Sequence, residues 1–164
     1  MKMYEEITKW GDETFFCEYI KDTDFSNLTP ITQVQALCFT KDGNFVIFED
    51  SKGRFGLPGG TVESGESLEE ALARELYEEA AVKIIEHGPL LHLRVTNLSS
   101  KPSRVDYQVR YWANVELLDE KVSDPAGKAV RRHVVNKKEL FGYVKWGKKL
   151  EIYYDEAKKL GIVQ

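Results

Sequence analysis

The feature that most constrains this chain is the 23-residue stretch from Gly60 to Val82, GTVESGESLEEALARELYEEAAV. A glycine-rich turn, Leu57-Pro58-Gly59-Gly60, leads into it. Ser67 followed by Glu70 has the spacing of a capping box, in which the serine side chain accepts a backbone N–H at the start of a helix. The stretch therefore predicts a turn followed by a helix that begins just after Ser67.

The predicted helix has an apolar stripe that would face a hydrophobic core. Its members recur at helical spacing and are Leu68, Ala71, Leu72 and Leu76. Helical character fades where the β-branched run of residues 82–85 begins, because β-branched side chains favour strands.

Three carboxylates, Glu75, Glu78 and Glu79, gather on one side of this helix. Side chains at i, i+3 and i+4 are neighbours, and like charges there repel by roughly 0.2–0.5 kcal/mol per pair. Spacing alone leaves two interpretations open. The face is a solvated surface that tolerates the repulsion, or it binds Mg²⁺ or Mn²⁺, which prefer oxygen ligands and substrate phosphates.

Bulk composition predicts one soluble cytoplasmic domain spanning residues 1–164. Hydrophobic residues make up 42% and charged residues 30%, which is ordinary for a globular domain. The net charge of -4 gives no reason to expect nucleic-acid binding. Acids stand where a signal peptide needs an apolar core, and no run of about 20 apolar residues suggests a membrane span. Cys17 and Cys38 are expected to be reduced and to lie in strands.

The element order predicts an α/β (α+β) fold with one mixed sheet and helices packed on its faces. Before the central helix we expect strands at 13–21, 34–40, 45–49 and 54–57, and after it strands at 90–97 and 105–118. Residues 119–132 are expected to form a polar loop. A short helical piece near Glu139 and Leu140 and a C-terminal helix at 148–160 complete the prediction.

In the strand predicted at 105–118, alternation divides the side chains between two faces. Tyr107, Val109 and Tyr111 share one face, and Gln108, Arg110 and Trp112 share the other. We expect only one of these faces to contribute to the core, and the sequence does not say which.

The Gly60–Val82 stretch resembles the signature of the Nudix hydrolases. That signature is a Gly, five residues, a Glu, seven residues, and then Arg-Glu-apolar-x-Glu-Glu-x-Gly-apolar. Gly60, Glu66 and the run from Arg74 to Val82 match it, except that Ala81 replaces the final Gly. The resemblance implies the family's α/β/α sandwich, with the metal-binding helix and a C-terminal helix packed on a mixed sheet.

The resemblance also implies an activity, the hydrolysis by water of a nucleoside diphosphate linked to another group X, with Mg²⁺ or Mn²⁺ as cofactor. By similarity, Glu75, Glu78 and Glu79 would be the metal carboxylates, and the main-chain carbonyl of Gly59 would be a further ligand. Glu75 is the favoured candidate for the general base. Arg74 would orient a glutamate through a bidentate contact, which its planar fork suits.

The remaining signature positions are expected to be structural. Gly60 belongs to the lead-in turn, and Glu66 would help to hold the loop before the helix. The usual Gly at position 81 is expected at a helix end, where the left-handed conformation costs an alanine about 1 kcal/mol. Since no side-chain chemistry is lost, Ala81 predicts an altered helix exit and not an inactive enzyme.

Many Nudix enzymes place a further acid on a loop beyond the motif. Here Glu120 is the preferred candidate for an additional metal ligand, ahead of Glu116, Asp119 and Asp124. The alternative is that all four belong to a solvated surface.

A basic segment at 128–149 contains eight Lys and Arg residues opposed only by Glu139. Arg131 and Arg132 are candidates for binding phosphates or an anionic X group, although a solvated face is the alternative. Phe55 is a candidate surface for stacking a nucleobase.

The substrate prediction rests on a likeness to the MutT-like group, which acts on (d)NTPs, because markers of other subfamilies are missing. Release of a nucleoside monophosphate (NMP) is then expected. The alternatives are a Nudix-fold sensor that binds a nucleotide without turnover and a hydrolase of a nucleotide sugar or dinucleotide. The expected partner is a small nucleoside diphosphate derivative, and the chain is expected to be a monomer or homodimer.

Overall fold

The computed structural model describes residues 1–164 and contains one mixed sheet. Its strand order is β1-β2-β7-β8-β3-β4-β5, with β6 paired to β3 and β9 paired to β4. Neighbouring strands are antiparallel except for β3 and β8, which are parallel. The strands are β1 (Lys2–Trp10), β2 (Glu13–Ile20), β3 (Ile31–Phe39), β4 (Phe45–Asp50), β5 (Phe55–Gly56), β6 (Gly59–Thr61), β7 (Val82–Asn97), β8 (Arg104–Leu117) and β9 (Ala129–Val135).

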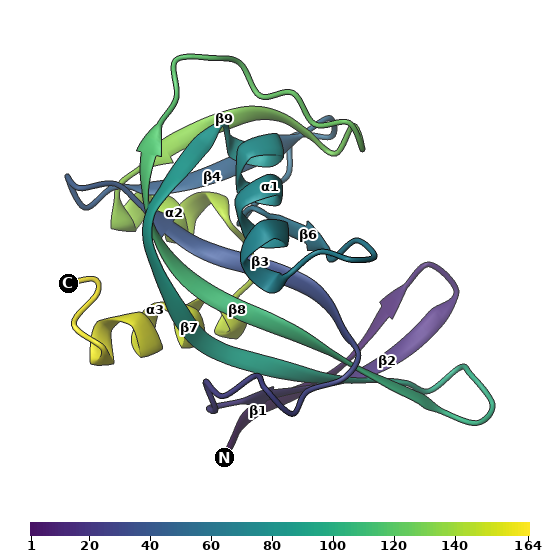
Figure 1. Cartoon of the computed structure of the whole chain (residues 1–164). Helices are drawn as coiled ribbons and strands as arrows, with labels where there is room; N and C mark the ends of the chain where they lie inside the picture. Colours follow the sequence, from purple (N-terminus) through teal and green to yellow (C-terminus); the bar gives the residue numbers. More distant parts are fainter.

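Three helices cover the two faces of this sheet (Figure 1). They are α1 (Leu68–Ala80), α2 (Lys137–Tyr143) and α3 (Lys148–Lys159). One core lies between the sheet and the apolar stripe of α1, and a second core lies between the sheet and the helices α2 and α3. The predicted mixed sheet with helices on its faces is thus confirmed. No helix is long and apolar enough to cross a bilayer.

Side chains of the central strands point alternately to the two faces of the sheet and contribute to both cores. In β3, Val34 and Ala36 pack toward α1, while Leu37 packs on the side of α2 and α3. In β4, Val46 and Ile47 are divided in the same way. These strands are therefore apolar on both faces, as expected for strands buried between two helical layers.

The expectation that only one face of the long strand β8 contributes to a core was wrong. Val109 and Tyr111 pack under α1. On the opposite face Gln108 and Arg110 are also buried, and the Arg110 guanidinium donates to the hydroxyl of Tyr153 in α3. Both faces are buried because helices cover both sides of the sheet. Elsewhere, the two cysteines are free and buried in strands, as predicted.

The structure contains strands, and parts of strands, that the sequence pattern did not predict, including the short β6 in the lead-in turn. The edge strand β1 was not expected, since its mostly exposed side chains include several charges. Strand β7 begins at Val82, not at Leu90, and accommodates Pro89 at an irregularity in its pairing with β8. Strand β9 lies partly in the region expected to be a loop, because its pairing with β4 outweighs its charged composition.

The start of α1 has the predicted capping box, whereas its exit at Ala81 is left-handed and is not altered in the way expected. The Ser67 side chain accepts the Glu70 N–H and the Glu70 side chain accepts the Ser67 N–H, which confirms the capping box. Ala81 ends the helix at φ 49° and ψ 53°, in the left-handed region. Arg132 of β9 donates to the carbonyls of Ala80 and Ala81, so a cation stabilises the negative end of the helix.

Replacing Ala81 with Gly is expected to raise the free energy of unfolding by about 1 kcal/mol, because glycine adopts a left-handed conformation without the steric cost of a Cβ atom. Urea unfolding of the wild type and the variant measures the change. The control is Ala80→Gly, one residue earlier and still helical, which is expected to lower stability. An unchanged or reduced stability for Ala81→Gly would contradict the inferred strain.

Candidate metal and active site

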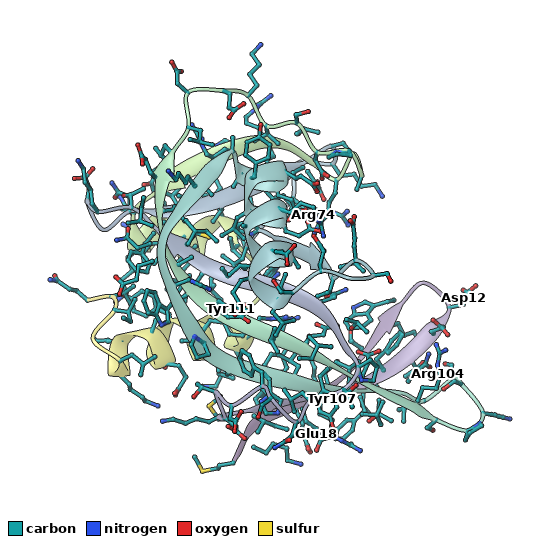
Figure 2. All side chains as sticks on the ribbon, in the orientation of Figure 1. Asp12, Glu18, Arg74, Arg104, Tyr107 and Tyr111 are labelled. Carbon is teal, nitrogen blue, oxygen red and sulfur yellow. The ribbon has the colours of Figure 1, made fainter.

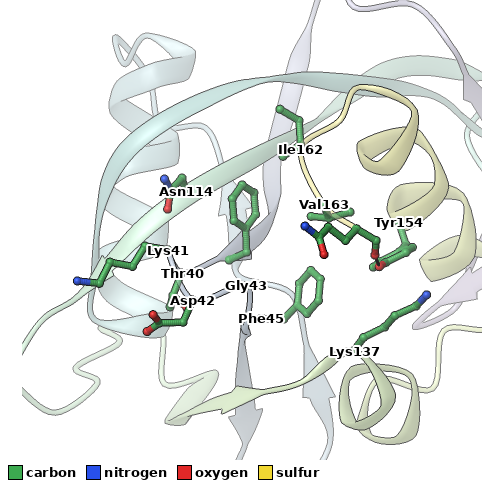
Figure 3. Close-up of a pocket in the computed structure, with 12 residues that line it drawn as sticks. Thr40, Lys41, Asp42, Gly43, Phe45, Asn114, Lys137, Tyr154, Ile162 and Val163 are labelled. Atoms are coloured by element: carbon green, nitrogen blue, oxygen red, sulfur yellow. Dashed lines mark hydrogen bonds between the residues drawn. The ribbon is translucent and has the colours of Figure 1, made fainter.

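A polar cleft of about 380 Å³ lies between α1, β3, β6 and the loop before β9. It brings together the three carboxylates of α1 with Arg74 and the lead-in glycines. The residues that line it are Gln33, Val34, Gln35, Gly59, Gly60, Thr61, Glu63, Arg74, Glu75, Glu78, Glu79, Asp124, Pro125, Ala126 and Lys128. A separate cavity of about 460 Å³ beside Tyr154 and the C-terminal residues contains no such cluster of acids (Figure 3).

The two glycines of β6 are required by close packing in this cleft. A Cβ atom on Gly60 would lie 2.5 Å from the carboxyl carbon of Glu75. A Cβ atom on Gly59 would lie 2.3 Å from the backbone oxygen of Val34. Glycine thus lets the α1 carboxylates approach the backbone of the turn directly.

Arg74, labelled in Figure 2, projects from α1, donates to the Thr61 carbonyl of β6 and binds several of the acids. Its Nε and Nη2 atoms contact the two carboxylate oxygens of Glu66 at 2.7 and 2.9 Å. Its Nη1 atom contacts Glu75 at 2.9 Å and Glu78 at 3.3 Å. The bidentate partner of Arg74 is therefore Glu66, and the contacts to the other two glutamates are single hydrogen bonds.

Glu66 also holds the loop that precedes α1. Its Oε1 atom accepts the backbone N–H of Glu63 at 2.8 Å. Hydrogen bonding from Arg74 lowers the pKa of Glu66 to about 2. Glu66 therefore stays ionised at neutral pH and anchors the guanidinium of Arg74.

Glu79 is the most buried of the three α1 carboxylates, with 2% of its surface exposed. One oxygen accepts the Gly59 N–H at 2.8 Å, and the other lies 3.3 Å from the ammonium of Lys128. Burial raises the pKa of Glu79 to about 7, although Lys128 and the Gly59 N–H favour the charged form. Burial likewise raises the pKa of Glu75, against the opposing effect of Arg74.

The cleft contains the kind of ligands that Mg²⁺ prefers, which are carboxylate oxygens beside an open space for phosphates and water. In the conformation described, no three His, Cys, Asp or Glu side chains converge around one point. The carboxylates are instead bound by Arg74, Lys128 and the Gly59 N–H. Binding of a metal ion by several of them therefore requires side-chain rearrangement.

The structure does not bring Glu120, the preferred loop acid, into the cleft. Glu120 is exposed and accepts a hydrogen bond from the Tyr77 hydroxyl at 3.1 Å. Asp124 lines the cleft instead, and its carboxylate accepts the backbone N–H groups of Ala126, Lys128 and Ala129. Asp124 thereby shapes the loop, a property that sequence spacing alone cannot reveal.

The other predicted substrate residues also lie outside the cleft. Arg131 is exposed and pairs with Glu49 at 3.6 Å. Arg132 stabilises the end of α1, and Phe55 packs against Tyr143 with 4.7 Å between ring centroids. Within the basic segment, the residue that reaches the cleft is Lys128.

A second cavity of about 510 Å³ adjoins the cleft, and sequence reasoning missed it. The two share Gln33, Gln35 and Lys128 as lining residues. The hint in the sequence was the polar side of β8, since Gln108 and Arg110 are unusual residues in a buried strand.

The amino-acid sequence was compared with models of known protein families, and one family matches. The NUDIX domain model matches residues 30–151 of the chain. The chain is a member of the Nudix family. The matched residues include the whole Gly60–Val82 stretch, so the predicted resemblance to the Nudix hydrolases is confirmed. No curated protein matches the sequence significantly.

Solved Nudix structures share the fold at low sequence identity. The Bacillus subtilis pyrophosphohydrolase BsRppH is 21% identical, with a TM-score of 0.72, covering 99% of this chain and all of that one. An ADP compounds hydrolase is 17% identical, with a TM-score of 0.58 and coverage of 99% and 96%. The NUDIX domain of Shewanella oneidensis NrtR, solved with ADP ribose, is 19% identical, with a TM-score of 0.56 and coverage of 83% and 95%.

The raised pKa of Glu79 predicts that the metal-free Nudix protein becomes less stable as pH rises from about 4.5 to 7. Over this range the folded state holds a proton that the unfolded state releases, so stability falls by up to about 3 kcal/mol. Urea unfolding in EDTA at pH 5 and pH 7.5 measures the difference. Glu79→Gln is expected to reduce it, and Glu69→Gln, on the exposed first turn of α1, to leave it in place. The same change in unfolding free energy between pH 5 and pH 7.5 in all three proteins would contradict the assignment.

Proposed function

We propose that this Nudix-family protein hydrolyses the pyrophosphate bond of a nucleoside diphosphate linked to X, most directly a (d)NTP, and releases an NMP. The observation that supports this proposal is the cleft in which Glu75, Glu78 and Glu79 of α1 meet Gly59 of β6. Oxygen donors beside an open, polar space suit a divalent cation together with a phosphate chain.

In this proposal Mg²⁺, or Mn²⁺, would be held by Glu78, Glu79 and the carbonyl of Gly59, and Glu75, the third carboxylate of the cluster, would deprotonate the water instead of binding the metal. When bound, it would neutralise phosphate charge and make water a better nucleophile. Arg74 keeps Glu75 and Glu78 positioned beside the cleft. Glu79 fixes the turn of β6 through the Gly59 N–H.

Glu75 is the proposed general base. Its carboxyl lies against Gly60, where no side chain intervenes, and burial raises its pKa against the opposing effect of Arg74. A base works best when its pKa lies near the working pH, because it is then both ionised and able to accept a proton. Lys128, which lines the cleft and pairs with Glu79, would supply positive charge for the phosphates.

A nucleotide sensor without turnover is the alternative function. Its support is the shared fold of the NrtR NUDIX domain, whose structure contains ADP ribose. The complete set of glutamates at positions 75, 78 and 79 favours the enzyme, because a sensor has no need of a metal-activated nucleophile. The similarity to an ADP compounds hydrolase keeps nucleotide sugars and dinucleotides among the substrates to test.

A panel of NTPs, nucleotide sugars and dinucleotides is incubated with the protein and Mg²⁺ or Mn²⁺. At least one of these compounds is expected to be hydrolysed to phosphate-containing products, and EDTA is expected to abolish the hydrolysis. Glu79→Gln is expected to lower the rate about 100-fold or more, since a metal site stabilises the transition state by several kcal/mol. Glu120→Gln serves as the matched control, because Glu120 lies outside the cleft, and it is expected to keep the wild-type rate.

A Glu79→Gln variant with full activity would overturn the metal-site proposal. Absence of turnover on the whole panel, combined with binding of a nucleotide by the wild type, would favour the sensor. Circular dichroism of each variant establishes that the protein is folded in these assays.

A further inference from the structure

The second cavity lies under the N-terminal hairpin, and we name it the hairpin chamber. It is lined by Glu6, Thr8, Trp10, Cys17, Tyr19, Gln33, Gln35, Leu93, Gln108, Arg110, Lys128, Trp146, Lys149 and Tyr153. Its volume of about 510 Å³ lies in the range of small-molecule sites. Because it shares Gln33, Gln35 and Lys128 with the carboxylate cleft, a ligand with its phosphates in the cleft can extend into the chamber.

Much of this chamber is built by residues outside the matched NUDIX domain. The domain match begins at residue 30, whereas β1 and β2, which supply one wall, end at Ile20. Alternation in β1 directs Glu6, Thr8 and Trp10 to the chamber, and Ile7 between them is 68% exposed. The wall thus lies outside the stretch that the NUDIX domain model matches, and residues 1–29 can set substrate selectivity apart from the shared domain.

Arg110 is the feature of the chamber that most needs explanation. It is 7% exposed, yet its hydrogen bonds go only to neutral groups, Tyr153, Gln108 and the backbone of Val109. No carboxylate lies within ion-pair distance of it. A buried guanidinium is costly unless its donors are hydrogen-bonded, so donors that no protein group accepts can be satisfied by an oxygen of a ligand. Arginine carries five N–H donors, and these three bonds leave two available.

The rest of the chamber favours a planar, uncharged ring over an anionic group. Trp10 and Trp146 offer aromatic surface for stacking, and base–aromatic stacking is a common source of nucleotide affinity. Lys149 is already paired with Glu6 at 3.4 Å, and the Glu6 carboxylate would repel a phosphate. An arginine fork donates well to a carbonyl oxygen on a base edge.

We propose that the hairpin chamber binds the nucleobase of the substrate, with Arg110 as the specificity-determining residue that selects a base edge bearing a carbonyl oxygen and with Trp10 as a stacking surface. The inference rests on the proposed function, since it places the phosphates in the carboxylate cleft. It goes further by naming the chemistry of the base, in which an oxo group is preferred to an amino group.

Binding of inosine 5′-monophosphate and adenosine 5′-monophosphate tests this selection, because the two bases differ in carrying an oxo or an amino group at position 6. Isothermal titration with Mg²⁺ is expected to show about tenfold tighter binding of the inosine nucleotide. Arg110→Met, which keeps the side-chain length and removes the donors, is expected to reduce this ratio to about twofold or less. Its affinity for ribose 5-phosphate is expected to be unchanged.

Trp10→Ala tests the stacking surface at a residue that is 47% exposed and packs on Phe15. It is expected to weaken both nucleotides about tenfold and to leave ribose 5-phosphate unaffected. Ile7→Ala, on the same strand but facing away from the chamber, is the matched control and is expected to bind like the wild type. If Arg110→Met does not fold, the wild-type affinity ratio and the Trp10 and Ile7 pair decide the question.

Equal affinity of the wild type for the two nucleotides, or identical binding by Trp10→Ala and Ile7→Ala, would overturn the inference. These results report base selection, which is measured separately from turnover. A wild type that hydrolyses nucleotides but shows no base selection refutes the chamber alone, whereas an active Glu79→Gln variant refutes the proposed function alone.

Discussion

The candidate site depends on one guanidinium. Arg74 lies among Glu66, Glu75 and Glu78 and donates to all three. Without a cation, acids at this spacing on one helix face repel one another, and their burial beside the sheet would add a desolvation cost. Arg74 offsets both effects while its bidentate contact with Glu66 fixes its direction. The cleft can therefore concentrate negative charge for a metal ion in a folded, metal-free protein.

A second constraint joins this helix to the sheet. Glu79 accepts the N–H of Gly59, and Glu75 lies against Gly60, so carboxylates of α1 contact the backbone of β6 directly. Any side chain at either glycine would collide with the carboxylate of Glu75 or with the backbone of β3. The turn before the helix and the carboxylates within it therefore form a single structural unit, which explains their close spacing in the sequence.

Sequence patterns predicted best where the interactions are local. The capping box at Ser67 and the helix that follows depend on residues within a few positions of one another. Prediction was poorer where distant partners decide the structure. Strand β9 is strongly charged, but pairing with β4 makes it a strand and places Arg132 at the end of α1. Neither contact leaves a trace in local hydrophobic periodicity.

The sequence by itself determined the Nudix signature, the chemistry of its oxygen donors and the mixed sheet with helices on both sides. Its motif residues converge because a turn and one helix hold them at fixed spacing. Only the tertiary structure decided that Asp124 and Lys128, and not Glu120 or Arg131, reach the cleft. It also decided that the N-terminal hairpin and Arg110 build a chamber beside it. These positions depend on long-range strand pairing and loop folding, which bring together residues that are far apart in the sequence.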